Sequence, residues 1–261
     1  MRLQSRVKRS LLKSQPIEQI GESESPFITA LIPAFNEGRS IGDVVRKVGN
    51  RVDKVVVIND FSSDKTPLIA KYLGATVLNH SKNMGVGAAM QTGINYSKAT
   101  KPDIVVTLDG DGQHRPEDIP RIIQPILSGE ADLVLGSRFL QGTPDMPVIK
   151  LLGNKFFAYL IRFLTGIRLT DTQTGFRALN RKALVDLDLK ANYTYVQEMI
   201  IDLYAKGFRI VEVPITALPR KYGSSKVALN VLEYAFRTLA IITHAYLHKV
   251  NSIKNNVKRK H

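Results

Sequence analysis

The sequence predicts an α/β fold in which helices cover both faces of a mostly parallel sheet. From residue 27 to residue 135, short apolar runs typical of buried strands alternate with amphipathic segments of helical period. The 261-residue chain, 44% hydrophobic, is long enough to bury one large core. Polar residues gather directly after several of the apolar runs, where parallel strands present their carboxyl ends. We therefore expect a ligand site at that edge of the sheet.

The expected elements follow one another in a regular order. Strands are predicted over residues 27–32, 54–58, 76–78, 104–108 and 132–135, with helices over 40–48, 64–73, 87–97 and 116–127. The last of these helices starts at Pro116, whose fixed φ suits a first helical position. After Arg138 the pattern changes to an apolar helix over 151–164, a strand over 176–179, a helix over 196–206 and a strand over 209–213.

The two ends of the chain are basic, and they divide it into three parts. The net charge is +14, and no acidic residue precedes Glu18 or follows Glu233. We expect a basic mobile arm over 1–25, a main domain over 26–225, and an amphipathic helix with a basic tail over 226–261. An anionic membrane surface is the expected partner of these ends rather than nucleic acid, because no nucleic-acid-binding module is visible.

Polar residues form one helical stripe in the otherwise apolar segment 226–248. Glu233 and Arg237 interrupt the segment, so we expect a helix in the membrane interface, or one packed in a homo-oligomer, and not a membrane span. A helix of the protein core is the plain alternative. The chain contains no Cys, which excludes disulfides and thiolate metal sites.

The segment Asp109-Gly110-Asp111-Gly112-Gln113 directly follows the apolar run 104–108. Side chains alternate at the end of an extended strand, so Asp109, Asp111 and Gln113 are expected to point the same way. Three hard oxygen donors suit Mg²⁺ or Mn²⁺ and leave coordination positions for the phosphates of a ligand. A solvated acidic turn is the plain alternative.

The segment Gly85-Val86-Gly87 invites a dinucleotide-binding interpretation, which fails for two reasons. Met90 stands at the third glycine position, and the segment follows the third predicted strand instead of the first. We expect Asn83, Gly85 and Gly87 to form a loop that lets the backbone approach a ligand.

Together these segments resemble the GT-A glycosyltransferases of family 2. The resemblance rests on Ile32–Glu37, residues 58–66, Asn83-x-Gly85-x-Gly87 and Asp109-x-Asp111-x-Gln113, in this order. Gly136-Ser137-Arg138, residues 171–177 and residues 214–226 resemble the branch that contains the dolichol-phosphate mannose and glucose synthases. The resemblance implies a Rossmann-type GT-A fold with C-terminal amphipathic helices. It implies a metal-dependent, inverting transfer of one sugar from a UDP- or GDP-linked donor to a polyprenyl or dolichyl phosphate. Transfer to a sugar hydroxyl of a glycan or lipid-linked saccharide is the alternative.

The resemblance also assigns roles to individual residues. The base and ribose of the donor would contact Pro33, Phe35, Glu37, Ile58 and Asp60, with Asn83, Gly85, Gly87 and Gly110 on the same donor side. Asp109, Asp111 and Gln113 would hold Mg²⁺ or Mn²⁺ at the diphosphate. The sugar phosphate and the acceptor phosphate would contact Arg138, Lys150, Asn154 and Arg220, with Ser225 and Lys226 nearby. Asp111, Arg138, Arg220 and Lys226 would take the most direct part in transfer.

Some positions depart from the family pattern or have plain alternatives. Asn59 and Phe61 stand where the family usually has Asp and Gly, and Lys150 stands where Arg is expected. Arg177 and Arg220 could instead be partners in surface ion pairs. Asp171 could instead serve only to orient its own loop. Glu198 is a minor candidate for a general base. Because a soluble donor must meet a lipid phosphate, a peripheral position at the cytoplasmic face of a membrane is expected.

Overall fold

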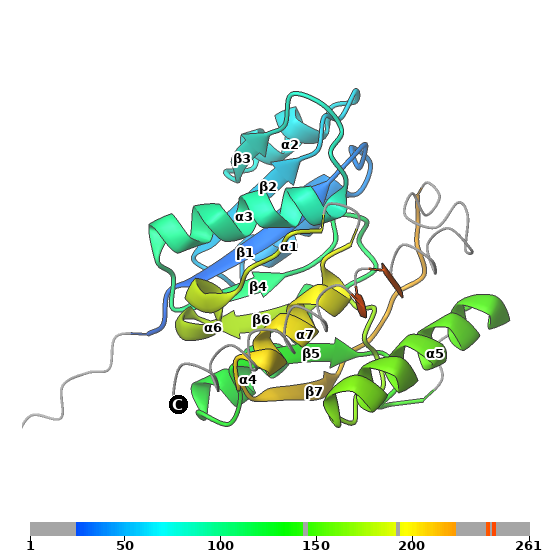
Figure 1. Ribbon diagram of the computed structural model, residues 1–261. Helices are drawn as coiled ribbons and strands as arrows, with labels where there is room; N and C mark the ends of the chain where they lie inside the picture. The colour runs from blue at the N-terminus through cyan, green and yellow to red at the C-terminus, as the bar shows by residue number, and fades with distance from the viewer. Residues whose placement is uncertain (1–24, 143–145, 192–193, 223–238, 241, 244–261) are drawn as a thin grey trace, which may run out of the picture.

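A computed structural model describes residues 25–142, 146–191, 194–222, 239–240 and 242–243. Its centre is a seven-stranded sheet with the order β3-β2-β1-β4-β6-β5-β7 (Figure 1). The strands are β1 (Ile28–Ala34), β2 (Lys54–Asn59), β3 (Thr76–Asn79), β4 (Ile104–Thr107), β5 (Leu133–Ser137), β6 (Arg177–Asn180) and β7 (Ile210–Pro214). The predicted α/β architecture is therefore confirmed.

The sheet is mostly parallel, and β6 is its exception. Strand β6 pairs antiparallel with both β4 and β5, whereas the pairs β1–β2, β1–β4, β2–β3 and β5–β7 are parallel. Because β6 runs against its neighbours, it begins at the edge where β4 and β5 end. The loop before β6 therefore lies beside the acidic segment that follows β4.

Helices cover both faces of the sheet, and each face has its own apolar cluster. One face carries α1 (Ile41–Gly49), α2 (Thr66–Tyr72) and α4 (Ile119–Leu127). The other carries α3 (Val86–Thr100), α5 (Val148–Thr165), α6 (Arg181–Asp186) and α7 (Val196–Ala205). In α1, Ile41, Val44, Val45 and Val48 are buried at helical spacing, which explains why this segment forms a helix against the sheet.

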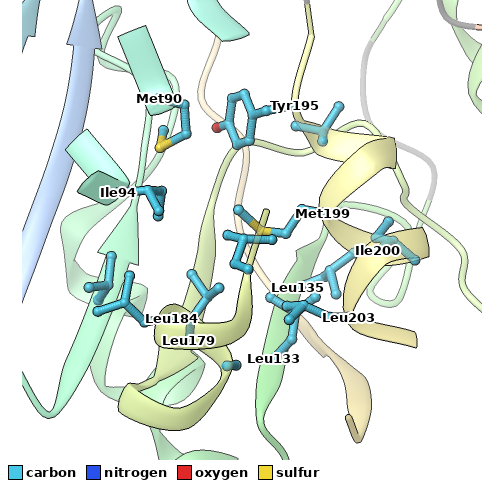
Figure 2. Close-up of a cluster of buried hydrophobic side chains, with 14 of the residues drawn as sticks. Met90, Ile94, Leu133, Leu135, Leu179, Leu184, Tyr195, Met199, Ile200 and Leu203 are labelled. Atoms are coloured by element: carbon cyan, nitrogen blue, oxygen red, sulfur yellow. The ribbon is translucent and has the colours of Figure 1, made fainter. Parts of the chain in front are cut away.

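Figure 2 shows part of the cluster on the second face, in which side chains of α3, α6 and α7 meet those of β5 and β6. Met90 and Ile94 come from α3, Met199 and Leu203 from α7, and Leu184 from α6. Helix α5 packs on α7 and contributes Phe157 and Ile161 to the same cluster. The elements after residue 138 therefore share one core with the first half of the chain.

Some element boundaries differ from those predicted. The expected helix 116–127 is a 3₁₀ turn η1 (Pro116–Asp118) followed by α4, and α5 starts three residues before the expected residue 151. Helix α6 was not predicted, because its six residues are too few to show a period; its start is marked by Asn180, whose side chain accepts a hydrogen bond from the Ala183 N–H.

Most of the predicted C-terminal amphipathic helix lies outside the described residues, as do Ser225, Lys226 and residues 1–24 of the arm. Residues 239–240 and 242–243 are described and are helical. Ile242 is buried in the same cluster as Phe157, so this turn packs against the protein. No helix in the described part of the chain combines the length and apolar character needed to cross a membrane.

Asp132 joins the last three strands at the opposite edge of the sheet from the acidic segment. Its carboxylate accepts hydrogen bonds from the Arg209 backbone and side chain and from the Asn180 amide, at 2.8 to 3.1 Å. The bonds from the Arg209 side chain hold the pKa of Asp132 at about 2.

We expect Asp132→Asn to lower the melting temperature at pH 7 by about 3 °C. Because the folded-state pKa is depressed, the stabilisation is present above the ordinary value of 3.8 and is lost as the pH falls toward about 2. The difference from wild type should therefore shrink over that interval in thermal melts. Glu130→Gln, an exposed acid in the same turn, is the matched control and should melt like wild type. A difference that stays constant down to pH 2 would contradict this assignment.

Candidate active site

Polar segments meet in one cavity of about 230 Å³ at the carboxyl ends of β1, β2 and β4. It is lined by Pro33, Ala34, Phe35, Glu37, Asp60, Val86, Ala89, Asp109, Gly110, Asp111, Gln113 and Arg220. Most of the residues predicted for the donor side and all three predicted metal ligands are therefore brought together.

The loops after β1 and β2 are fixed to each other by hydrogen bonds. The Asn36 N–H donates to Ser62 Oγ at 2.9 Å, and the Ser63 N–H donates to Asn36 Oδ1 at 2.8 Å. The Glu37 N–H donates to Thr66 Oγ1 at 2.8 Å. Asn36 has a φ of 52°, a left-handed conformation that Asn tolerates better than most residues. These hydrogen bonds between the two loops place Phe35 and Glu37 at the cavity.

Asp60 lines the cavity, and its carboxylate also organises the loop before α3. Oδ1 accepts from the Met84 N–H and Oδ2 from the Gly85 N–H, both at 2.8 Å. His80 Nδ1 lies 2.8 Å from Oδ1, and His80 Nε2 lies 2.9 Å from Thr92 Oγ1. No local motif marks His80, so sequence reasoning missed it; its place follows from the end of β3 beside β2.

Four predicted donor-side residues, Ile58, Asn83, Gly85 and Gly87, do not line the cavity. Gly87 belongs to the first turn of α3 and is buried there, because the helix starts one residue earlier, at Val86. Ile58 is fully buried in the core against α3 and does not line the cavity, because its side chain points into the sheet–helix interface. Gly85, with a φ of 90°, keeps the predicted loop conformation that favours glycine, and Asn83 is exposed beside it.

The acidic segment after β4 places two carboxylates in the cavity. Burial and the neighbouring Asp109 raise the pKa of Asp111, whose Oδ1 accepts a hydrogen bond from the Gln113 N–H at 2.9 Å. No group of three or more His, Cys, Asp or Glu side chains is placed to hold a metal within the described ranges. The Gln113 amide, which lines the same cavity, is the predicted third oxygen donor. Two crowded carboxylates and an amide suit a divalent cation that also binds phosphate oxygens.

The loop before β6 closes against Asp109. A Cβ on Gly175 would lie 2.8 Å from Oδ1 and 3.0 Å from Oδ2 of Asp109. Thr107 Oγ1 donates to the Gly175 carbonyl at 2.6 Å, which fixes this close approach. The Asp109 N–H donates to His114 Nδ1 at 3.2 Å, and the His114 ring packs on Phe176. The absence of a side chain at position 175 therefore makes room for a predicted metal ligand.

The segment after β7 returns to the acidic loop and brings Arg220 with it. The Leu218 N–H donates to the Gln113 carbonyl at 2.8 Å, and Gln113 Nε2 donates to the Leu218 carbonyl at 3.3 Å. The Arg220 guanidinium contacts Asp111 Oδ2 and lies 3.6 Å from Glu37 Oε1. Its alternative as a surface ion-pair partner is therefore wrong, because both partners lie inside the cavity.

Arg138, Asn154 and Asp171 form a second cluster that does not line this cavity. Arg138 Nε and Nη2 donate to the Asp171 carboxylate at 2.6 and 2.9 Å, and Asn154 Nδ2 donates to it at 3.0 Å. Burial is the largest single influence and raises the pKa of Asp171, but the hydrogen bonds and charge of Arg138 together with the Asn154 hydrogen bond outweigh it, so the pKa is lowered. Asp171 thus anchors Arg138, while Lys150 is exposed in the first turn of α5.

Arg177 and Glu198 have structural partners. Arg177 is fully buried and donates to the carbonyls of Thr172, Thr174 and Val196, so it is not a surface ion-pair partner. The Glu198 carboxylate accepts from the Lys190 and Ala191 N–H groups at 2.9 and 3.0 Å. Glu198 therefore holds its own loop, and it does not line the cavity.

The chain is similar to known glycosyltransferases. Residues 29–188 match the family Glycosyl transferase family 2. The chain is 33% identical to the UDP-N-acetylglucosamine–dolichyl-phosphate N-acetylglucosaminyltransferase of Methanococcus voltae, over 77% of this chain and 89% of that protein. It is 31% identical to the polyprenol monophosphomannose synthase of Mycolicibacterium smegmatis, over 79% of this chain and 83% of that protein.

The fold is that of a solved GT-A enzyme. The glucosyl-3-phosphoglycerate synthase of Mycobacterium tuberculosis, crystallised with Mn²⁺, UDP and phosphoglyceric acid, superposes with a TM-score of 0.67. It is 23% identical and the match covers 85% of this chain and 78% of that chain. This likeness establishes the GT-A fold that the sequence predicts.

We expect Gly175→Ala to weaken Mn²⁺ binding about tenfold, since an added methyl group must displace the Asp109 carboxylate at a cost of about 1 to 3 kcal/mol. Isothermal titration with Mn²⁺ in the presence of UDP measures the effect. Gly153→Ala is the matched control, because nothing lies within 4 Å of its Cβ position. Unchanged Mn²⁺ affinity in a folded Gly175→Ala protein would show that Asp109 is not a ligand.

Proposed function

Because this chain belongs to glycosyl transferase family 2, we propose that it transfers one sugar from a nucleoside diphosphate sugar to a polyprenyl phosphate. One observation carries the proposal: an acidic loop, whose oxygen donors suit a divalent cation, and an arginine from a distant segment face the same cavity. A loop of this kind binds a diphosphate through a cation, and the arginine suits a second anion. The names of the relatives from Methanococcus voltae and Mycolicibacterium smegmatis support a lipid phosphate as that anion.

The donor side of the site would be the part nearest β1 and β2. Pro33, Phe35 and Glu37 line it, and Asp60 fixes its rim through the loop at Met84 and Gly85. Aromatic and polar groups of this kind suit the base and ribose of UDP or GDP. Mg²⁺ or Mn²⁺ held by Asp109, Asp111 and Gln113 would offset the charge that develops on the leaving diphosphate.

The proposed reaction is a displacement with inversion at the anomeric carbon. A bond forms from an oxygen of the acceptor phosphate to that carbon, while the carbon–oxygen bond to the diphosphate breaks and the nucleoside diphosphate keeps the electron pair. The acceptor is already an anion at neutral pH, so it needs no general base. This agrees with the position of Glu198, whose carboxylate is occupied by two backbone N–H groups.

Cations are needed where the two anions approach each other. In a cleft of low dielectric, repulsion between a diphosphate and a phosphate would otherwise oppose binding. Arg220 is in the cavity, and Arg138 is fixed at the end of β5 by Asp171. We assign both to the acceptor phosphate, with Lys226 as a further candidate from the sequence.

Helix α5 supplies a surface that suits a membrane. Its outer side carries an apolar stripe, defined as the exposed residues Val148, Ile149, Leu152, Phe156, Tyr159 and Phe163. Lys155 and Arg162 are exposed on the same helix, and residues 147–170 contain no acidic residue. Apolar and basic side chains on one helix are typical of segments that lie in a membrane interface. We propose that the protein binds peripherally to the anionic cytoplasmic face of a membrane through this stripe.

The direct test is a product assay with purified protein, Mg²⁺ or Mn²⁺, polyprenyl phosphate, and a panel of UDP- and GDP-sugars. We expect one glycosylated lipid phosphate by mass spectrometry, with inverted anomeric configuration by NMR. Asp111→Asn should lower the rate about 100- to 1000-fold, because charge stabilisation at the leaving group is lost. Transfer to a saccharide hydroxyl, with none to lipid phosphate, would replace this proposal by its alternative.

The membrane proposal has its own test. We expect replacing both Phe156 and Phe163 by Ser to lower binding to phosphatidylcholine–phosphatidylglycerol vesicles by at least tenfold, since each aromatic ring buries apolar surface worth about 1.5 to 3 kcal/mol. Co-sedimentation measures this loss. Tyr72→Ser on α2, which removes another exposed aromatic side chain, is the matched control. Equal binding of the two variants would rule out the apolar stripe as the docking surface.

A further inference from the structure

Arg220 pairs with Asp111, which is one of the predicted metal ligands. Its guanidinium contacts Asp111 Oδ2, and Asp111 Oδ1 already accepts a hydrogen bond from the Gln113 N–H. Both carboxylate oxygens are thus engaged by groups of this chain. A divalent cation at Asp111 would lie within a few ångströms of the guanidinium, and like charges at that distance repel strongly in a partly buried site.

The Arg220 side chain is only 20% exposed, and that of Asp111 only 8%. Two carboxylates crowded in a partly buried loop are unfavourable unless a cation accompanies them. The guanidinium supplies that positive charge from within the chain. It also reaches toward Glu37 at 3.6 Å, which is an ion-pair distance but too long for a hydrogen bond.

We propose that Arg220 is an internal counter-ion of the metal site, which the metal–nucleotide complex displaces and which then turns to the acceptor phosphate. The identity of the acceptor rests on the proposed function. The displacement of Arg220 by the metal–nucleotide complex concerns the metal site alone and does not depend on the acceptor. It implies an order of binding in which metal and donor enter first and the lipid phosphate second. Until Arg220 is released, the acceptor lacks one of its cations.

The segment that carries Arg220 is joined to the metal loop, which provides the coupling. Gln113 is held to Leu218 by its own carbonyl and by its side-chain amide nitrogen. Coordination through the amide oxygen of Gln113 would therefore act on the segment two residues before Arg220. In addition, Arg220 Nη1 is buried and has no hydrogen-bond acceptor among the residues that the structure describes. A buried N–H group without an acceptor is unfavourable, and an incoming phosphate oxygen would satisfy it.

The test measures Mn²⁺ binding by electron paramagnetic resonance on the full chain without nucleotide. We expect Arg220→Gln to bind Mn²⁺ about tenfold more tightly than wild type, because the competing charge is gone. Arg121→Gln is the matched control: Arg121 also joins an acid, Asp118, to a distant element, through the Pro214 carbonyl at the end of β7, but it lies outside the cavity. Arg121→Gln should bind Mn²⁺ like wild type.

Arg220→Lys is a second control, which separates the loss of positive charge from a loss of structure at this position. It keeps the positive charge, so its Mn²⁺ affinity should stay within a few fold of wild type. Equal or weaker Mn²⁺ binding by a folded Arg220→Gln protein, judged by its melting temperature, would overturn the proposal.

A second measurement follows the acceptor. Binding of a short-chain polyprenyl phosphate to wild type should tighten at least tenfold once Mn²⁺ and UDP are present, and this gain should be lost in Arg220→Gln. Acceptor binding that is independent of Mn²⁺ and UDP would contradict the ordered release. If Arg220→Gln binds Mn²⁺ more tightly but the wild-type protein forms no glycolipid, Arg220 is a counter-ion of the metal site and the proposed lipid phosphate acceptor is wrong. If the wild-type protein forms the glycolipid but Arg220→Gln binds Mn²⁺ with unchanged affinity, the proposed function holds and the counter-ion role of Arg220 is wrong.

Discussion

Strand β6 runs antiparallel between β4 and β5, and the candidate site depends on that reversal. In a sheet with parallel strands only, the chain before β6 would enter at the far edge. Here the loop 171–176 starts at the edge where β4 and β5 end. Gly175 therefore lies against Asp109, and Asp171 lies against Arg138. One strand direction thus brings the acidic loop after β4 and the loop 171–176 before β6 to the same edge of the sheet (Figure 1).

Arginine–carboxylate pairs connect segments that are distant in the sequence. Asp132 pairs with Arg209, Asp171 with Arg138, and Asp111 with Arg220. Breaking such a pair leaves an uncompensated charge where it is poorly solvated, so each pair fixes the relative position of two segments. The Asp111 pair differs from the others because its carboxylate also lines the cavity, where another cation can compete for it. The same interaction that orders the segment after β7 is therefore the one that a ligand is able to exchange.

Local patterns in the sequence predicted the strands, most helices and the acidic loop after β4 that lines the cavity, because each depends on a few neighbouring positions. The contacts that needed long-range pairing were not predictable. His80 reaches Asp60 only because β3 ends beside β2, and Gly175 reaches Asp109 only because β6 is inserted beside β4. Ile58 was assigned to the donor by resemblance, whereas alternation along β2 turns its side chain into the core. Family resemblance therefore led to the cavity, and which of its residues contact a ligand stays a prediction.

The two departures from the family pattern at the end of β2, Asn59 and Phe61, are connected through the structure. Phe61 has a φ of 64°, a left-handed conformation that a bulky residue adopts only when its surroundings impose it, and glycine is the usual family residue there. Its neighbours supply the constraint. The Asn59 side chain accepts a hydrogen bond from the Ser62 N–H and donates one to Asn79 Oδ1. An ionised aspartate could accept the first of these but could not donate the second. Asp60 is held by two backbone N–H groups and His80. Asparagine at 59 thus fastens the turn to β3 and helps it hold Phe61 in a conformation that glycine would adopt without strain.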